Sequence, residues 1–529
     1  MRARHNSPKT SAIAAPDDFR GAKGMSKEKK LIKNTALIGI GNICTKGIAF
    51  LLLPVYTAIL SPEEYGTVDL VLTYAALFTI ILTLQLEQAV FRFLVEAREN
   101  PQKQKQYIST ALATVMLVLL LFLPAGYLVL SGWHYEYTGF FLAITAANVV
   151  AAVTLQLPRG LDDPVTYTMG STLNGAMQVL LNALFVAGFR WGIAGIFTAN
   201  ILASALSVLF IACRLRLWRQ ISLVYFDRTC LRAMLKYALP VICYSVGWWV
   251  IGVSDRLVIN LTIGTAYNGL YAVANKFPTL FHMVSSIFQR AWMESSFESF
   301  GAQDRNHYYG KVIGSAIRFY CACNLALVAV IPFLFPVLID PQYGDAYYYI
   351  PILTTAMMIY GICALYEAVH FAFMQTGKVA RATALAAAVN VAINILLIER
   401  IGLYAAALST LASYGIILAI YVGEMRKTVE AAVEKGFVAG QILMYALVCG
   451  AYYTENTAFR IIAALCAALS CCVTNRQLLL GCLRRACRKK NEKMEATKPQ
   501  EKDAPVVMQH DYKAAAEAAQ HTEIFRRSL

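Results

Sequence analysis

The sequence predicts an all-α polytopic membrane protein of about fourteen transmembrane helices, built as two six-helix bundles plus two C-terminal helices. Three observations support this prediction: the composition, the lengths of the apolar runs and the placement of positive charge. Of the 529 residues, 58% are hydrophobic and only 15% are charged, and the mean hydropathy is +0.52. A soluble domain of this length carries charge at about a quarter of its positions. The composition therefore indicates that lipid, rather than water, surrounds most of the chain.

The apolar runs have the length of membrane spans. A helix needs about 20 mostly apolar residues to cross about 30 Å of hydrocarbon. The first run follows a long polar head and lacks a small-residue cleavage site, so it indicates an uncleaved span rather than a signal peptide. The predicted spans lie near residues 34–57, 67–91, 107–131, 138–158, 168–189, 193–213, 238–262, 268–290, 314–339, 349–374, 380–398, 403–423, 438–454 and 458–481.

Positive charge alternates along these spans. With the N-terminus in the cytoplasm, the predicted inner connections and helix ends hold twenty Lys and Arg residues, whereas the outer ones hold three, Arg190, Arg400 and Arg460. Positive residues concentrate on the cytoplasmic side of membrane proteins. An error of one span would destroy the alternation. The pattern therefore supports both the span count and two cytoplasmic termini, and the acidic and tyrosine-rich stretch 340–349 suits an outer interface.

The polar segments divide the chain. We expect residues 1–33 to form a basic, largely disordered cytoplasmic N-terminus, and either Met1 or Met25 suits the start of the protein. The expected order continues with a first bundle (34–213), a basic cytoplasmic linker (214–237), a second bundle (238–423), two extra spans (424–481) and a largely disordered basic and mixed tail (482–529). The net charge of +15 lies mostly in the two tails. It therefore indicates anionic lipid head groups rather than nucleic acid.

A weak internal repeat relates the two bundles. A shift of 203 residues aligns Ile32-Lys33 with Leu235-Lys236 and Gly66 with Gly269, and Gly192 resembles Gly402 at an offset of 210. Both halves begin on the cytoplasmic side. If the repeat is real, its axis runs along the membrane normal, as in transporters built from parallel repeats.

Motifs for chemistry are absent from the sequence. None of the thirteen cysteines forms a metal-knuckle pair, so we expect no metal and no cofactor. The sequence also has no nucleophile elbow, Walker A loop or zinc-protease motif, and none of its predicted loops is long enough for a catalytic domain. A transporter driven by an ion gradient, the membrane potential or the substrate gradient fits better than an enzyme.

Ionisable residues inside spans are candidate site residues, because each costs about 2.5–3.5 kcal/mol at the bilayer centre and tends to face a wet cavity or a partner. Lys46 lies halfway along the first span. Asp255, Arg256 and Lys276 lie at similar depth in the seventh and eighth spans. We expect Asp255 to neutralise Arg256 or Lys276, or to bind an ion or substrate.

Two further pairs lie nearer the inner ends of spans. Glu87 and Arg92 are candidate cavity residues at the inner end of the second span. Glu367 and His370 are three residues apart, share a helix face, and form either a structural pair or a proton relay.

The opening LIKNTALIGIGNICTKGIAFLLLPVYTAILSPEEYGTVDL resembles the first helices of bacterial polysaccharide-biosynthesis flippases, with Pro54 and Tyr65-Gly66 at the matching positions. These proteins belong to the multidrug/oligosaccharidyl-lipid/polysaccharide exporter superfamily. The segment SVGWWVIGVSDRLVINLTIGTAYNGLYAVANKF is similar to their seventh and eighth helices. FQRAWMESSFE is similar to the end of the eighth, although the proline usual in that region is replaced around Glu294. The resemblance covers about residues 30–480.

The resemblance implies a bacterial inner-membrane flippase that moves an undecaprenyl-type lipid-linked oligosaccharide outward by alternating access. Its partners would be the lipid-linked glycan, membrane lipids and polysaccharide-assembly proteins. A pyrophosphate away from bulk water needs cationic partners, and Lys46 and Arg256 are the main candidates. A drug/cation antiporter of the same superfamily and a lipid II flippase are the alternatives. A glycan polymerase or ligase would require a large outer loop.

Overall fold

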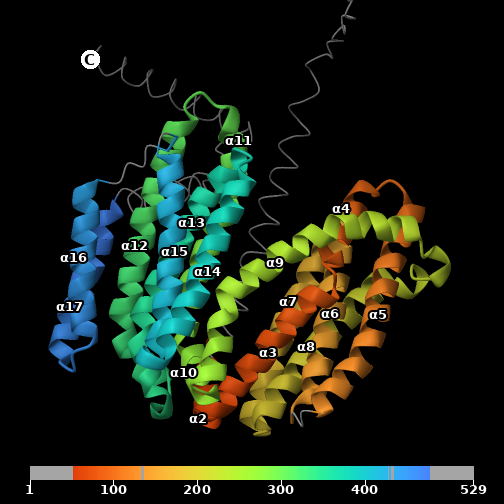
Figure 1. Ribbon diagram of the computed structural model, residues 1–529, viewed down its shortest axis with the longest axis horizontal. Helices are drawn as coiled ribbons and strands as arrows, with labels where there is room; N and C mark the ends of the chain where they lie inside the picture. Colours follow the sequence, from red (N-terminus) through yellow and green to blue (C-terminus); the bar gives the residue numbers. More distant parts are fainter. Residues whose placement is uncertain (1–49, 51, 133–135, 427, 430–433, 477–529) are drawn as a thin grey trace, which may run out of the picture. The chain divides into compact units, whose positions relative to one another are not determined.

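The structure is a computed structural model that describes residues 50, 52–132, 136–426, 428–429 and 434–476 (Figure 1). Within these ranges the chain is helical and contains no strand, in agreement with the predicted fold class. Nine of the described helices are long and apolar enough to cross a membrane. The predicted first span lies mostly outside the described residues, which include only its last part, α2 (Leu53–Ile59).

Each of the other predicted spans corresponds to a helix or to two consecutive helices. The first half contains α3 (Pro62–Leu82), α4 (Leu86–Glu96), α5 (Pro101–Gly132), α6 (Thr138–Gly160), α7 (Pro164–Asn182, continued as a π-helix over Ala183–Gly188) and α8 (Gly192–Leu215). The second half contains α9 (Arg228–Thr262), α10 (Thr265–Ala274), α11 (Lys276–Glu298), α12 (Arg305–Leu338), α13 (Ile350–Ala372), α14 (Thr376–Ile401) and α15 (Leu403–Met425). It is followed by α16 (Lys435–Tyr452) and α17 (Thr457–Thr474).

The second span is discontinuous. Ser61 caps α3 by accepting a hydrogen bond from the Glu64 amide, and the Glu64 side chain accepts one from the Ser61 amide. The sequence predicts one helix over 67–91, but Leu84 and Gln85 adopt positive φ values of 51° and 53°, which end α3 and start α4. The break places the buried Gln85 and the first turn of α4 in the inner third of the predicted span.

A single helix connects the two halves. Helix α9 begins at Arg228, inside the stretch expected to be a linker, because Asp227 caps it by accepting a hydrogen bond of 2.7 Å from the Thr229 amide. The Asp227 amide donates to Thr110 of α5 at 3.0 Å. The first part of α9 packs on α4 and α5, and its later part packs on α10 and α14 (Figure 1). The linker region is therefore fixed to the first half at one end and to the second half at the other.

The internal repeat corresponds to a reciprocal contact between α3 and α10. A Cβ on Gly66 would overlap the carbonyl oxygen of Thr265, and a Cβ on Gly269 would overlap the carbonyl oxygen of Pro62. The repeat offset of 203 residues relates the two contacts: Gly66 corresponds to Gly269 in the second half, and Thr265 corresponds to Pro62 in the first half. Pro62 and Thr265, which also start the two helices, are equivalent, as are Gly66 and Gly269. The two halves thus meet at equivalent places around an approximate two-fold axis.

Buried side chains form one shared core and two separate ones. At the end predicted to face outward, Tyr65 of α3 lies in the same core as Tyr271 and Phe277 of α10 and α11. At the other end, a core of α4, α5, α6 and α9 is distinct from one formed by α11 to α15. The described contacts therefore join the halves at the predicted outer end, and at the inner end α9 is the element of the second half that packs in the core of the first.

Candidate functional site

An ion pair joins the two halves beside the glycine contact. Nε of Arg256, on α9, lies 2.6 Å from Oδ2 of Asp69, on α3, and the two side chains are only 19% and 17% exposed. The sequence predicts that Asp255 neutralises Arg256 or Lys276, or binds an ion or substrate, and it does not single out Asp69. The same rule on charges inside spans could have found Asp69, because it lies within the predicted span 67–91.

Lys276 adds a second cation to this junction. It begins α11, and its Nζ lies 5.9 Å from the ring centroid of Tyr65. Arg256 and Lys276 together carry two positive charges against the single negative charge of Asp69. The Asp69–Arg256–Lys276 junction is therefore net positive, and it is assembled from both halves of the chain.

Asp255 points into the second half instead. Its carboxylate accepts hydrogen bonds from Tyr271 Oη at 2.8 Å, Asn394 Nδ2 at 2.6 Å and Thr410 Oγ1 at 2.7 Å. Asp255 as a whole is only 4% exposed. Among the described residues, no Lys or Arg forms an ion pair with it. Three neutral donors therefore satisfy a buried negative charge and tie α9 to α10, α14 and α15.

Further polar groups extend this network. Ser254 Oγ donates to Asn390 Oδ1 at 3.0 Å, and Asn390 Nδ2 donates to Ser409 Oγ at 3.3 Å. Carboxylate, amide and hydroxyl oxygens are the ligands that hard cations prefer. The described residues hold no cluster of three or more His, Cys, Asp or Glu side chains suited to a transition metal. The oxygens of the Asp255 network are thus of the kind that bind hard cations.

The remaining candidates lie apart from one another. Lys46 is outside the described residues. Glu87 lies in the first turn of α4, beside the break in the second span. Arg92, on the same helix, pairs with Glu96 at 3.3 Å in an exposed (i, i+4) contact and stacks over Tyr237, 4.7 Å from its ring centroid. Exposed ion pairs of this kind contribute little to stability, and these two contacts account for the position of the Arg92 side chain.

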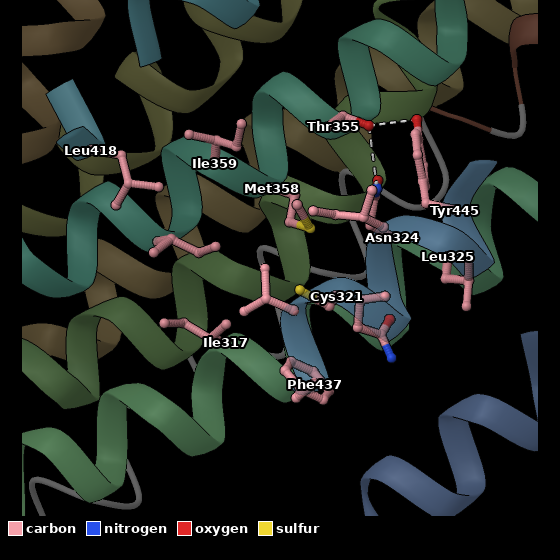
Figure 2. A pocket seen from close by; sticks show the side chains of 14 residues that line it. Ile317, Cys321, Asn324, Leu325, Thr355, Met358, Ile359, Leu418, Phe437 and Tyr445 are labelled. Carbon is pink, nitrogen blue, oxygen red and sulfur yellow. Dashed lines mark hydrogen bonds between the residues drawn. The ribbon is translucent and has the colours of Figure 1, made fainter. Parts of the chain in front are cut away.

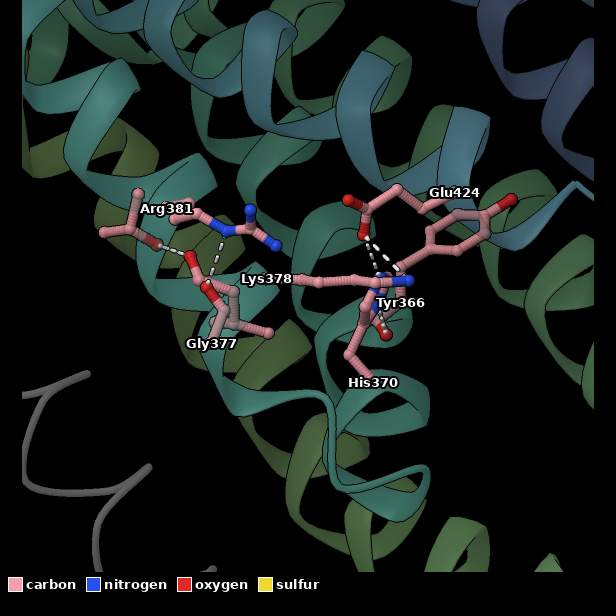
Figure 3. A network of polar contacts seen from close by, with 8 residues as sticks. Tyr366, His370, Gly377, Lys378, Arg381 and Glu424 are labelled. Atoms are coloured by element: carbon pink, nitrogen blue, oxygen red, sulfur yellow. Dashed lines mark hydrogen bonds and ion pairs between the residues drawn. The ribbon is translucent and has the colours of Figure 1, made fainter.

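His370 and Glu367 do not form an ion pair. His370 is fully buried, and its Nε2 lies 3.1 Å from Oε2 of Glu424, on α15 (Figure 3). Lys378, in the first turn of α14, places Nζ 3.9 Å from the same oxygen. Within the described chain Glu367 forms no ion pair and is half-buried one turn earlier on α13.

An apolar cavity of about 300 Å³ lies between α12, α13, α15 and α16 (Figure 2). At its polar end, Asn324 Nδ2 donates to Thr355 Oγ1 at 3.4 Å, and Thr355 Oγ1 lies 2.5 Å from Tyr445 Oη. Most of the remaining lining is apolar and includes Ile317, Leu418 and Phe437, and Gln441 adds one amide. This lining suits an apolar chain and offers no cation for a charged head group.

Comparison with solved structures first defines the class of fold. A multidrug resistance MATE family transporter of the MOP superfamily, in an inward-facing conformation, aligns with a TM-score of 0.60 and 15% identity over 72% of this chain and 94% of its own. Lipid II flippase MurJ in an inward closed conformation aligns with a TM-score of 0.62 and 13% identity over 84% and 100%. The chain therefore has the fold of the MOP superfamily, the exporter superfamily that the sequence resembles, and it is a multi-pass membrane protein.

The sequence comparison then identifies the family. Residues 31–293 match a family profile described as "Polysaccharide biosynthesis protein". This match, over about half of the chain, confirms the resemblance seen in its first, second, seventh and eighth spans. None of the curated proteins matches the sequence.

Proposed function

We propose that this protein moves a lipid-linked oligosaccharide, carried on an undecaprenyl-type lipid, from the cytoplasmic to the outer leaflet of a bacterial inner membrane by alternating access. The family match and the MOP fold support a transporter of this branch. Both termini would lie in the cytoplasm, as the charge alternation indicates. The partners would be the lipid-linked glycan, membrane lipids and the proteins that assemble the polysaccharide.

The net positive junction of Asp69, Arg256 and Lys276 is the observation that carries this proposal. A diphosphate removed from water needs charge-assisted hydrogen bonds, and a guanidinium can bind two phosphate oxygens at once. Arg256 is held by one carboxylate and Lys276 by an aromatic ring. A diphosphate could take over both cations because its negative charge exceeds that of Asp69. Lys46 remains a third candidate cation.

Asp255 is the group we propose for coupling to an ion. The hydrogen bonds to this buried carboxyl group come from neutral donors, so a cation or proton entering the network would gain a direct partner. The oxygens of Asn390 and Thr410 lie beside it. An ion bound there would alter the contacts that tie α9 to α14 and α15, and this is how an ion gradient could act on the conformation.

The test of the cation proposal separates transport from folding. Arg256→Gln leaves Asp69 without its partner and should lower protein yield, because breaking a buried pair costs about 3–5 kcal/mol. The double variant Asp69→Asn/Arg256→Gln removes both charges and should recover the yield but not transport. Lys276→Gln and Lys46→Ala should reduce flipping at normal yield, and Lys46→Arg should retain part of it because the charge persists.

The readout is the ratio of outward-facing to total lipid-linked glycan, normalised to folded protein. Lys311→Gln, which removes an exposed cation from α12, is the matched control and should flip normally. Normal flipping by the Lys276 variant and the double variant together would exclude a diphosphate contact at the junction. A cationic drug exported by the unaltered protein, without glycan flipping, would instead favour the antiporter.

A further inference from the structure

The contact between His370 and Glu424 requires a proton. His370 Nδ1 lies 2.9 Å from the carbonyl oxygen of Tyr366, and a carbonyl oxygen only accepts hydrogen bonds, so Nδ1 carries a hydrogen. Nε2 then carries a lone pair in the neutral ring. That lone pair would face a carboxylate oxygen at 3.1 Å, which is repulsive unless a proton lies between the two atoms. The pair therefore holds one proton, and the imidazole is the more basic of its two sites.

Lys378 offers the same carboxylate a second partner. Its Nζ lies 3.9 Å from Oε2 of Glu424, at the limit of an ion pair. Figure 3 shows the Lys378 side chain reaching toward the carboxylate that contacts His370. His370 is in the last turn of α13, Lys378 in the first turn of α14 and Glu424 near the end of α15, so the three meet at one end of these helices.

We propose that Glu424 is the moving part of a proton-operated switch, pairing with His370 while the pair holds its proton and with Lys378 after the proton has left. On deprotonation the proton passes to water, to which the Glu424 side chain is 30% exposed. Neutral His370 then presents a lone pair to the carboxylate, which turns to the ammonium group. The link between α15 and α13 is exchanged for a link between α15 and α14. The use of this switch in transport rests on the function proposed above. The binding of a proton by His370 and Glu424 does not depend on that function.

Other titratable and charged side chains lie around His370, Glu424 and Lys378. On α13 itself, Glu367 is one turn away and half-buried, and the ring of Tyr421 on α15 packs against His370 with centroids 4.8 Å apart. Helix α11 presents the neutral Trp292 and Ser296 to the backbone of α13. The other cations nearby are placed elsewhere: Arg381 of α14 donates to the Gly377 carbonyl at 3.4 Å, and Arg305 stacks on Phe373.

Nitrogen NMR of ¹⁵N-histidine-labelled full-length protein in lipid, with the His370 signals assigned by their loss in His370→Gln, measures the proton directly. In the unaltered protein we expect both ring nitrogens to be protonated at mildly acidic pH. Glu424→Gln keeps a hydrogen bond to unprotonated Nε2 through its amide. It should weaken proton binding at His370 about ten-fold or more, because the negative charge opposite Nε2 is lost.

The other variants set the direction of the switch. Lys378→Met removes the competing cation and should make His370 keep its proton to higher pH. Glu399→Gln, an exposed acid in the last turn of α14, is the matched control and should change the titration little. A neutral His370 in the unaltered protein across pH 5–8, or a titration unchanged by Glu424→Gln, would overturn the proposal. Loss of flipping with an unchanged His370 signal would instead concern the transport function alone.

Discussion

Two neighbouring residues, Asp255 and Arg256, illustrate how position on a helix decides the role of a charge. They follow each other on α9 and therefore point about 100° apart. Arg256 faces the first half and meets Asp69. Asp255 faces α14 and α15, where only neutral donors reach it. One residue thus links the two halves of the protein, and its neighbour forms a polar centre inside one half.

At this scale we predict that Asp255→Asn removes ion coupling without unfolding the protein. An asparagine keeps the size of the side chain and part of its hydrogen bonding to Tyr271 and Thr410, but it brings no charge for a cation. Flipping measured in vesicles should lose its response to an imposed sodium or proton gradient. Asp340→Asn, in a predicted outer loop, is the control with an unchanged response. A full gradient response in Asp255→Asn would show that the network is only structural.

At the scale of helices, the close approach of α3 and α10 depends on Gly66 and Gly269. Each glycine admits a backbone carbonyl of the other helix where a methyl group would overlap it. The side chain of Asn268 reinforces the contact by donating to the Gly66 carbonyl oxygen at 3.1 Å. Gln342, in the second half, donates hydrogen bonds to the carbonyl oxygens of Thr57 and Leu60 at 2.7 and 3.1 Å. Side chains of the second half therefore bind several backbone carbonyl groups of the first half near the contact of α3 with α10.

We predict that Gly66→Ala or Gly269→Ala forces α3 and α10 apart and favours a conformation open at the predicted outer end. The measurement is labelling of Asn268→Cys, a residue that is fully buried here, by an impermeant maleimide, with the signal of the native cysteines subtracted. Labelling should rise several-fold. Gly415→Ala, on α15, is the control, because a Cβ there meets no neighbouring atom within 4 Å. Equal labelling in all variants would mean that the helices tolerate the methyl group without separating.

For the whole molecule, the distribution of the cores has a mechanical consequence. One core includes both halves at the predicted outer end, and each half has its own core at the other end. Burial of apolar side chains stabilises contacts roughly in proportion to area. Apart from α9, whose first part packs on α4 and α5, the halves are thus stabilised against each other at one end only. In this conformation, movement of one half relative to the other would break the shared core and leave the two separate cores intact.

The predicted topology is tested on the whole chain. Reporter fusions after residues 134, 264 and 344 should indicate the outside, and fusions after 100, 225 and 305 should indicate the cytoplasm. The physical reason is the concentration of Lys and Arg in the connections assigned to the inside. Fusions in the polar tails, before the first and after the last predicted span, provide cytoplasmic references. Two or more reversed assignments would invalidate the span count.

The sequence by itself determined the class of fold, because a bilayer imposes a fixed apolar length on every span and concentrates positive charge on one side. The spans after the first therefore appear as helices close to their predicted positions. The repeat of Gly66 and Gly269 was also readable, since only glycine permits such close helices. The charges inside spans were recognisable for a similar reason, because insertion of each one is costly.

Only the tertiary structure decided which of these charges meet. Sequence separation does not reveal which faces of distant helices pack together, so Asp69 and Glu424 were not among the predicted partners of Arg256 and His370. The break at Leu84 and Gln85 was also hidden, since neither residue favours the left-handed conformation that it adopts there. Partners in a helical membrane protein are set by the rotation and packing of whole helices, and these depend on contacts made across the entire bundle.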